Sequence, residues 1–442
     1  MRSYDTAADS LDTIRAALTA RDTAQDAQAE AVVRAILDDV KARGDAAVLD
    51  YTRRFDWPEA TVDAMQISSD DLLDTWDALD AHGQGLINGA SDQIREFHYS
   101  ERDRLKTWLD LPHSPRATND GLPNLVGQLL QPVDRVGVYV PGGKAAYPST
   151  VLMAGLPASA AGVKEIIICT PADREGKVLP LVAAAAADFA KRLFKIGGAQ
   201  AIAAMAYGTE TVPKCDVIVG PGNKYVNTAK RLVYGEVGID MLAGPSEVAI
   251  VADEGANPAF VAADLLAQTE HGPDNKGVLF CSSSPILEQC RTELYKQREQ
   301  LSRQEILEAS GQNLIFVRTR SVDESLDLCN TLAPEHLELM VREPLAVLHL
   351  VRNAGAVLLG DHTSAPLGDY WAGPSHTLPT AGAARFSSPL SVATFMKRTS
   401  VLYYSKEAAA EAAEDVARFA EAEGFDAHAR AARLRKEPPP AR

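Results

Sequence analysis

The 442-residue sequence is poor in cysteine, in aromatic residues and in positive charge. Its five cysteines, Cys169, Cys215, Cys281, Cys290 and Cys329, form no C-x-x-C pair, so neither a disulfide framework nor a cysteine-type zinc site is indicated. Lysine and arginine number 44 against 60 aspartates and glutamates, which gives a formal charge of −16. This balance argues against nucleic acid or anionic membrane as a main partner and favours a cationic ligand.

Long apolar runs are also missing. The longest, from Val178 to Ala187, is too short and too rich in alanine to cross a bilayer. The first residues lack a basic start that leads into an apolar stretch, as a secretory signal would have. We therefore expect a cytoplasmic protein, and the length is enough for roughly three domains with a large core.

The hydrophobic pattern divides the chain into a helical start and an alternating middle. Up to about Leu130, apolar residues such as Val33, Ile36, Leu37 and Val40 recur at helical spacing. From residue 135 onward, short β-branched runs are each followed by a glycine-containing turn and an alanine-rich stretch. The runs are VGVYV, EIIIC, LFKI, CDVIV, EVAIV, GVLFC, NLIFV and AGAVLL. This alternation predicts an α/β fold with parallel sheets flanked by helices, divided between two layered domains.

Three segments stand apart from that alternation. Residues 361–390 show neither helical nor strand periodicity, and an irregular stretch of that length inside a compact protein is usually functional. Residues 406–434 are rich in Ala, Glu and Arg and predict a helix that is interrupted near Gly424. Residues 105–128 contain proline and glycine, which indicates a surface loop.

Three strand-to-helix turns are rich in glycine: PGGK at 141–144, GGAQ at 197–200 and GPGN at 220–223. Glycine lets the backbone approach a ligand, and the helix that follows presents free N–H groups to a phosphate. None matches a strict dinucleotide or P-loop motif, and each alone also fits an ordinary tight turn. Three of them in one α/β domain favour a nucleotide.

The segment Gln268-Thr269-Glu270-His271 ends a helix predicted to run from about Asn257, because Gly-Pro follows it. Gln268 and His271 are three residues apart on one helix face, where they offer an oxygen and a nitrogen to one metal ion. The alternative is that His271 stands there only because the helix dipole favours a positively charged side chain at the carboxyl end of a helix.

The segment Pro334-Glu335-His336 is predicted to open a helix, with proline first and an acidic residue in the first turn. This explains Glu335 but not His336, since a cation there would oppose the dipole. A neutral imidazole is preferred at such a position, and that is also the state of a general base.

The irregular segment holds Asp369, Trp371, His376 and Arg385 among glycines and prolines. Asp369 is a candidate to complete a metal site, although a solvated surface loop is the plain alternative. Glu423 and His428, in the tail, would by themselves pass as surface residues of an amphipathic helix.

Seven segments taken together resemble histidinol dehydrogenase. They are RVGVYVPGGKAAYPSTVLM, KIGGAQAIAAMAYGT, VGPGNKYVNTAKR, IDMLAGPSEVAIVAD, DLLAQTEHGPD, APEHLEL and GDYWAGPSHTLPTAGAARFSSPLSV. The resemblance runs in order from Arg135 to Ser400 and is weaker at both ends. Ser375 departs from it, because family members often carry Asn there.

The resemblance implies two incomplete Rossmann-like domains with helical extensions, in an intertwined homodimer. The implied division is an extension at 1–29, a discontinuous first domain at 30–137 and 247–386, an inserted second domain at 138–246, and an extension at 387–442 that reaches the partner subunit.

The resemblance also implies a zinc- and NAD-dependent enzyme that oxidises histidinol to histidine by two hydride transfers, the last step of histidine biosynthesis. It implies Gln268, His271, Asp369 and, from the partner, His428 as zinc ligands. It implies Glu335 as the residue that activates water and His336 as the general base. The implied substrate contacts are Ser246, Gln268, His271, Glu335, His336, Asp369, His376, Glu423 and His428. The implied dinucleotide contacts are Tyr139, Gln200 and Asn223.

Three other functions stay open on the sequence. A relative could oxidise another small alcohol with the same base, a two-lobed binder could keep the frame without activity, and a zinc hydrolase could use Glu335 and His336 on water. The glycine turns have no purpose in a hydrolase. Because no cysteine lies in a site motif, a thiohemiacetal intermediate is not expected, and base-assisted hydration is.

Overall fold

The computed structural model describes residues 1–20, 27–110, 124–142, 147–270 and 272–436. It divides into two compact units. The larger unit comprises Met1–Glu101 and Val133–Phe395, and the smaller comprises Arg102–Pro132 and Met396–Arg442. Among the described residues, no helix is both long and apolar enough to cross a membrane.

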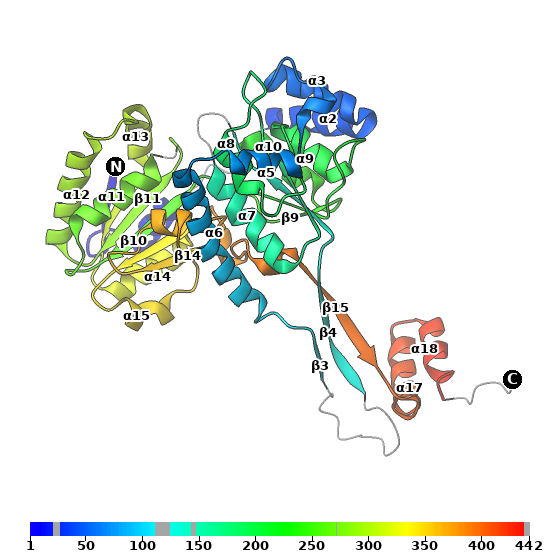
Figure 1. Cartoon of the computed structure of the whole chain (residues 1–442). Helices are drawn as coiled ribbons and strands as arrows, with labels where there is room; N and C mark the ends of the chain where they lie inside the picture. Colours follow the sequence, from blue (N-terminus) through cyan, green and yellow to red (C-terminus); the bar gives the residue numbers. More distant parts are fainter. Residues whose placement is uncertain (21–26, 111–123, 143–146, 271, 437–442) are drawn as a thin grey trace. The chain divides into compact units, whose positions relative to one another are not determined.

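The first sheet of the larger unit is wholly parallel (Figure 1). Its strands, in spatial order, are β1 (Arg2–Asp5), β12 (Leu314–Arg318), β11 (Lys276–Cys281), β10 (Glu247–Ala252), β13 (His336–Met340) and β14 (Ala356–Leu359). The chain elements around it are α1 (Leu11–Thr19), α11 (Pro258–Thr269), α12 (Ser284–Arg298), α13 (Gln304–Ser310), η1 (Gly311–Asn313), α14 (Val322–Leu332), α15 (Pro344–Val347), η2 (Leu348–Leu350) and α16 (Ala365–Tyr370).

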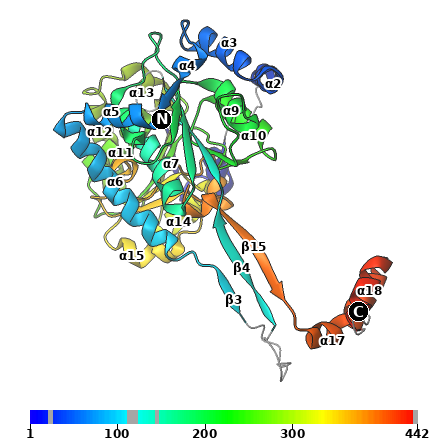
Figure 2. The same cartoon turned by 45° about the vertical axis from the view of Figure 1, so that its right-hand side comes forward.

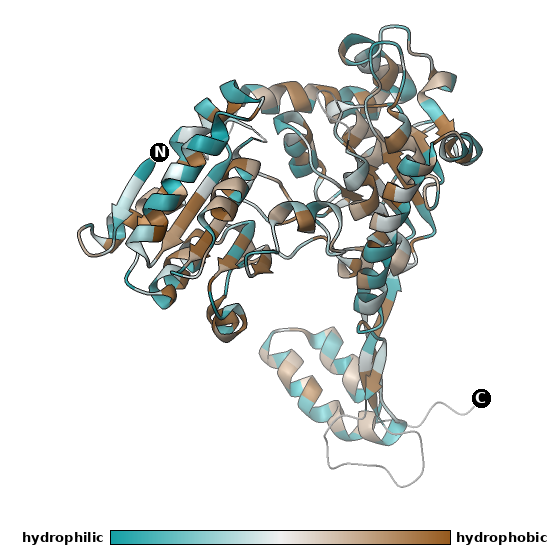
Figure 3. Ribbon diagram, turned by 60° about the vertical axis from the view of Figure 1, so that its left-hand side comes forward, coloured by the Kyte–Doolittle hydropathy of each residue, from teal (hydrophilic) through white to brown (hydrophobic). Residues whose placement is uncertain are grey.

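Strand β10 shows why this sheet needs helices on both faces. Every residue of EVAIVA is buried. Val248 and Ile250 pack with α11, α12 and α13, whereas Ala249 and Val251 pack with α1 and α14. A parallel strand covered on both sides reads as a continuous apolar run rather than an alternating one, and the apolar centre of the sheet is coloured brown in Figure 3.

The second sheet is parallel except for its edge strand β2. Its order is β2 (Gln66–Ser68), β7 (Arg192–Phe194), β6 (Glu165–Cys169), β5 (Arg135–Tyr139), β8 (Val217–Val219) and β9 (Gly238–Ile239). The remaining elements of this part are α2 (Ala27–Arg43), α3 (Asp45–Phe55), α4 (Val62–Met65), α5 (Ser69–Asp77), α6 (Ala81–Arg102), α7 (Pro148–Ala161), α8 (Pro180–Ala186), α9 (Gly198–Tyr207) and α10 (Lys224–Val233). The loops that follow β14 contain η3 (Ala383–Arg385) and η4 (Val392–Phe395).

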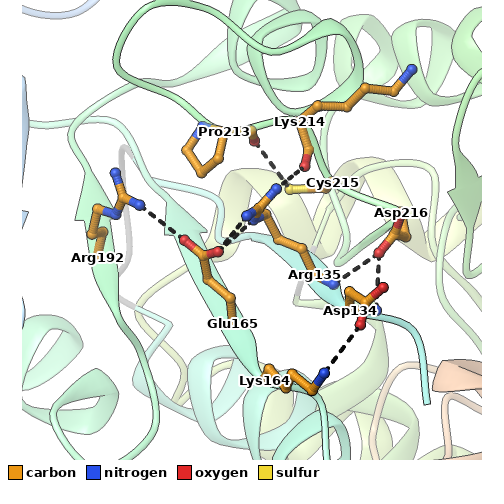
Figure 4. A network of polar contacts seen from close by, with 9 residues as sticks. All are labelled: Asp134, Arg135, Lys164, Glu165, Arg192, Pro213, Lys214, Cys215 and Asp216. Atoms are coloured by element: carbon orange, nitrogen blue, oxygen red, sulfur yellow. Dashed lines mark hydrogen bonds and ion pairs between the residues drawn. The ribbon is translucent and has the colours of Figure 1, made fainter. Parts of the chain in front are cut away.

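The amino ends of the second sheet are fastened by ion pairs (Figure 4). The carboxylate of Glu165 on β6 pairs with Arg135 on β5 and with Arg192 on β7, at 2.6 and 3.0 Å. The Asp216 carboxylate accepts from the backbone N–H groups of Asp134 and Arg135 at 3.0 and 2.8 Å. This edge is therefore occupied by side chains, and the glycine turns lie at the opposite, carboxyl ends of the strands.

The smaller unit contains an antiparallel sheet in the order β15 (Met396–Tyr403), β4 (Leu125–Pro132) and β3 (Trp108–Asp110). Strands β4 and β15 run side by side in both views (Figures 1 and 2). Strand β15 is followed by the helices α17 (Lys406–Ala422) and α18 (Asp426–Arg433), whose shared buried core consists of alanine. The helix break predicted near Gly424 is confirmed, since Gly424 adopts a φ of +80° between the two helices.

Several predicted elements differ from the structure. The helical start contains β1 and β2, which pair at sheet edges. The segment predicted as a loop at 105–128 supplies β3 and β4, and its residues 111–123 lie outside the described residues. The irregular segment at 361–390 contains the short helix α16. Strands β1, β2 and β3 are short and lie at sheet edges, α16 is a short helix, and β4 is the central strand of its sheet, between β15 and β3. In the strands, pairing with distant partners decides the structure more than local pattern does.

The helices assigned by the sequence to a domain with 247–386 pack elsewhere. Val33, Ile36 and Leu37 of α2 share one buried core with Ile202 of α9 and Val226 of α10. Their apolar stripe thus covers the second sheet, and β2 joins that sheet too. The domain boundaries themselves stay a prediction.

Candidate active site

The proposed catalytic pair lies at the amino ends of the first sheet's strands. Helix α14 ends at Leu332, its cap Ala333 takes a left-handed φ of +52°, and Pro334 then prevents the helix from continuing. Glu335 follows and His336 begins β13. The prediction that Pro334 opens a helix is therefore wrong: the proline marks the end of one helix, and the apolar run after it is a buried strand.

Neighbouring strands bring further polar groups to this edge. The backbone N–H of Glu247, the first residue of β10, donates to Glu335 Oε2 at 3.0 Å. Asn275, just before β11, accepts from the Ser246 N–H at 3.2 Å and donates to the Gln268 carbonyl at 3.1 Å. Parallel strands start at one edge, and α11 returns its carboxyl end to that edge, so the segments meet there.

Helix α11 confirms the predicted placement of Gln268. The helix is capped by the Asn257 side chain and ends at Thr269, and Gln268 is buried in its last turn. The negative end of the helix dipole therefore faces this edge, where it favours a cation. His271 lies outside the described residues.

Asp369, in α16, joins the same cluster. Its Oδ1 lies 3.5 Å from His336 Nε2, and His336 Nδ1 lies 3.8 Å from Glu335 Oε2. His376 Nδ1 is 3.0 Å from the Asp369 carbonyl oxygen. The structure thus brings the adjacent residues Glu335 and His336 together with Asp369 and His376, which come from a later segment of the sequence.

Burial and charge alter the acid–base properties of the pair. Burial raises the pKa of Glu335 to about 7, against the opposing effect of the His336 charge and the Glu247 N–H. Burial lowers the pKa of His336, but the carboxylates of Asp369 and Glu335 more than offset it, so the pKa is raised above 6.5. The sequence predicted a neutral imidazole; the neighbouring carboxylates favour the protonated form.

Ser375 and the cysteines have structural roles here. The buried Ser375 hydroxyl donates to the Met153 carbonyl at 3.1 Å and accepts from the Thr377 N–H at 3.2 Å, so it fixes the loop beside His376. The five cysteines are all buried and free, and burial raises the pKa of Cys281 to about 11 and of Cys290 to about 12. Thiols of that kind are poor nucleophiles.

The predicted dinucleotide contacts line one cavity of about 670 Å³ at the carboxyl ends of the second sheet. Tyr139, Gln200 and Asn223 all contribute to its wall. The Gly198 N–H donates to the Tyr139 hydroxyl at 3.1 Å, and Asn223 caps α10 by accepting from the Tyr225 and Val226 N–H groups. Ligands of α/β proteins commonly bind at such strand ends.

The third glycine turn is held by a buried ion pair that the sequence did not reveal. Lys230 and Asp240 side chains are each about 1% exposed. The Asp240 carboxylate accepts from the Gly220 N–H, and the Lys230 ammonium donates to the Gly220 carbonyl, each at 2.8 Å. Gly220 has a φ of +112°, and a Cβ there would lie 2.1 Å from the Tyr139 carbonyl oxygen. The turn thus requires glycine.

Other residues of the site were also missed. Glu247 lies in the recognised segment IDMLAGPSEVAIVAD but was given no role there, and Asn275 and Asp56 lie outside the recognised segments; only the fold shows the hydrogen-bond partners of all three. For Glu247, one signal existed: a carboxylate that begins an apolar strand is unusual and needs a partner when buried. Nothing in the local sequence distinguishes Asp56.

The tail residues Glu423 and His428 belong to the smaller unit. Glu423 ends α17 and His428 lies in α18, where its ring is 5.3 Å from the ring of Phe425. Both are exposed within the single chain. Their assignment to the substrate site stays a prediction.

The two parallel sheets, the cavity beside glycine turns and the buried Glu–His pair define a two-lobed α/β enzyme. Comparison with known proteins is more specific: residues 19–436 match the family model described as histidinol dehydrogenase. The chain therefore belongs to the histidinol dehydrogenase family, and is an oxidoreductase of histidine biosynthesis.

Individual relatives agree over nearly the full length. The chain is 43% identical over 438 residues to histidinol dehydrogenase of Geobacter sulfurreducens, which covers 98% of this chain and 100% of that one. It is 46% identical over 407 residues to that of Bacillus subtilis, covering 91% and 92%. The crystal structure of histidinol dehydrogenase from Elizabethkingia anophelis superposes with a TM-score of 0.90 at 34% identity, covering 99% of this chain and 98% of that one.

Proposed function

We propose that the chain oxidises L-histidinol to L-histidine through the aldehyde, with two NAD reduced for each product. The observation that carries this proposal is the buried Glu335–His336 pair beside Asp369, in a chain of this family. The formal charge of −16 also suits a cationic amino alcohol.

His336 is the proposed general base of both oxidations. In the first, it takes the hydroxyl proton of the alcohol while the carbinol hydride passes to NAD, which leaves the aldehyde. In the second, it takes a proton from the aldehyde hydrate while a second hydride leaves to a second NAD, which gives the acid. Asp369, 3.5 Å from Nε2, orients the ring and stabilises the protonated form that each oxidation produces, and the ring releases this proton to solvent before it acts again.

Glu335 is the proposed group that hydrates the aldehyde. Its Oε2 is anchored by the Glu247 N–H. A pKa of about 7 lets it accept a proton from water and return it near neutral pH. With all five cysteines buried, hydration is favoured over a covalent thiol adduct.

Gln268, His271 and Asp369 are the proposed zinc ligands of this chain, with His428 of a second copy as a further ligand. Their amide, imidazole and carboxylate donors form a mixed set that zinc accepts, and the buried Glu335, Asp369 and the carboxyl end of α11 favour a cation at this edge. Among the described residues, no group of three His, Cys, Asp or Glu side chains is arranged to hold a metal, and the proposed set includes an amide and His271. When bound, zinc would orient the amino alcohol for hydride transfer.

The proposal includes a cytoplasmic homodimer. Each substrate site would combine Ser246 and His376 of one chain with Glu423 and His428 from the tail of the other chain. The smaller unit exposes large apolar side chains, among them Leu402, Val416 and Phe419, and its helices share only an alanine core. Such a unit needs a further surface to bury that area.

The test is the number of NADH formed per product acid, measured with histidinol and excess NAD. Two NADH per histidine, lost after chelation and restored by zinc, are expected. Histidinol that yields no NADH with zinc-loaded, dimeric protein would exclude the substrate and point to another alcohol. Activity that survives complete chelation would exclude the metal.

A further inference from the structure

Asp56 lies at the end of α3, in the cavity beside the glycine turns, and takes no part in the proposed reaction. It lines the same cavity as Tyr139, Gln200 and Asn223. Its Oδ2 is 3.3 Å from the Gly197 N–H and 3.4 Å from Gln200 Nε2, both of which donate to it. Oδ1 accepts no hydrogen bond from the described residues and remains available to a ligand.

The carboxylate occupies a place where phosphate is often bound. The N–H groups at the start of a helix attract anions, but here side chains of the protein already engage those of Gly197 and Gly198. Gly197 donates to Asp56, and Gly198 donates to the Tyr139 hydroxyl. A ligand phosphate at this point would meet a carboxylate instead of free donors, so a ligand must present hydrogen-bond donors to Asp56.

The cavity suits the adenosine end of a dinucleotide. Ile36 and Phe55 give its wall apolar surface for a flat ring, and Arg54 and Arg174 provide positive charge for a diphosphate. Neither of the proposed catalytic residues, Glu335 and His336, lines this cavity. The reacting nicotinamide is therefore expected outside it.

We propose that Asp56 accepts a hydrogen bond from the adenosine 2′-hydroxyl of NAD and excludes the 2′-phosphate of NADP. The proposal rests on the proposed NAD dependence and adds its cofactor specificity. The Gln200 amide donates to Oδ2 of the same carboxylate at 3.4 Å, which leaves Oδ1 for the hydroxyl. A carboxylate that reads a ribose hydroxyl is the general solution of NAD-specific sites, reached here without their glycine motif.

The experiment is calorimetric binding of NAD, NADP and 2′-deoxy-NAD to metal-free protein without substrate, so activity plays no part. We expect the native chain to bind NAD about 10- to 100-fold more tightly than either analogue, the range for one hydrogen bond to a charged group. In Asp56→Asn, the affinity for NAD is expected to fall toward that of the native chain for 2′-deoxy-NAD. The preference for NAD over NADP is expected to fall about tenfold. The exposed Asp63→Asn, with the same change of charge, should bind all three as the native chain does.

Two results would overturn the proposal. One is an unchanged NAD to NADP ratio in Asp56→Asn. The other result concerns the native chain. If it binds 2′-deoxy-NAD as tightly as NAD, but binds more weakly an NAD analogue with an acetyl group in place of the nicotinamide carboxamide, Asp56 would be assigned to the nicotinamide end. If the native chain binds neither NAD nor NADP, the proposed NAD dependence itself would be refuted.

Discussion

The carboxylate of Asp56 is expected to destabilise the folded chain at neutral pH, and its removal to stabilise it. Burial raises the pKa of Asp56 from an ordinary 3.8 to about 6, while the Gly197 N–H opposes the rise. At about 1.36 kcal/mol per pH unit, the charged form costs the native state up to about 3 kcal/mol above pH 6. Because the pKa is raised in the folded state, stability is lost as the pH rises from 4 to 6.

Asp56→Asn removes the charge and keeps an oxygen that accepts from the Gly197 N–H. We therefore expect the variant to exceed the native chain in stability at pH 7 by up to about 3 kcal/mol, with the difference shrinking toward pH 4. The measurement is the urea midpoint of both chains at fixed protein concentration, from pH 4.5 to 7.5, with the exposed Asp63→Asn as the matched control. A difference that does not change with pH would refute the argument, because any effect on packing alone is independent of pH.

The remaining predictions concern the Glu335–His336 pair and the third glycine turn. Glu335→Gln should slow oxidation of the aldehyde by about 10²-fold or more and that of the alcohol much less, seen in single-turnover NADH formation with each substrate; equal losses would remove Glu335 from hydration. His336→Asn should lower kcat by about 10²- to 10⁴-fold, while the NAD affinity measured by calorimetry is unchanged. A near-native kcat would show that His336 is not the general base. Lys230→Met should cost about 3–5 kcal/mol of unfolding free energy, because Asp240 is left buried without its partner; a loss within the error of urea denaturation would show that the turn is held otherwise. Gly220→Ala should cost at least about 2 kcal/mol, whereas Gly311→Ala, where a Cβ meets nothing within 4 Å, should change stability by less than about 1 kcal/mol.

The local pattern was most informative where strands are buried on both faces. Runs such as EIIIC and GVLFC predicted β6 and β11 correctly, because a doubly covered parallel strand must be apolar throughout. The glycine turns were placed at strand ends for a similarly local reason, since Gly220 cannot carry a side chain at its φ of +112°. The pattern failed at His336, where a proline after a helix end looks the same as one at a helix start.

The sequence by itself determined which runs are buried, where glycine is required, and which family the ordered motifs resemble. It could not determine which distant groups meet. That Asp369 lies 3.5 Å from His336 and that Glu247 anchors Glu335 follow only from strands that start at a common edge and from a helix that returns to it. That Asp56 accepts from the Gly197 N–H, just before α9, follows from the packing of α3 and α9 into one core. The pKa values of Glu335 and His336 depend on the same contacts, because burial and neighbouring charge are properties of the packed molecule and not of the residue type.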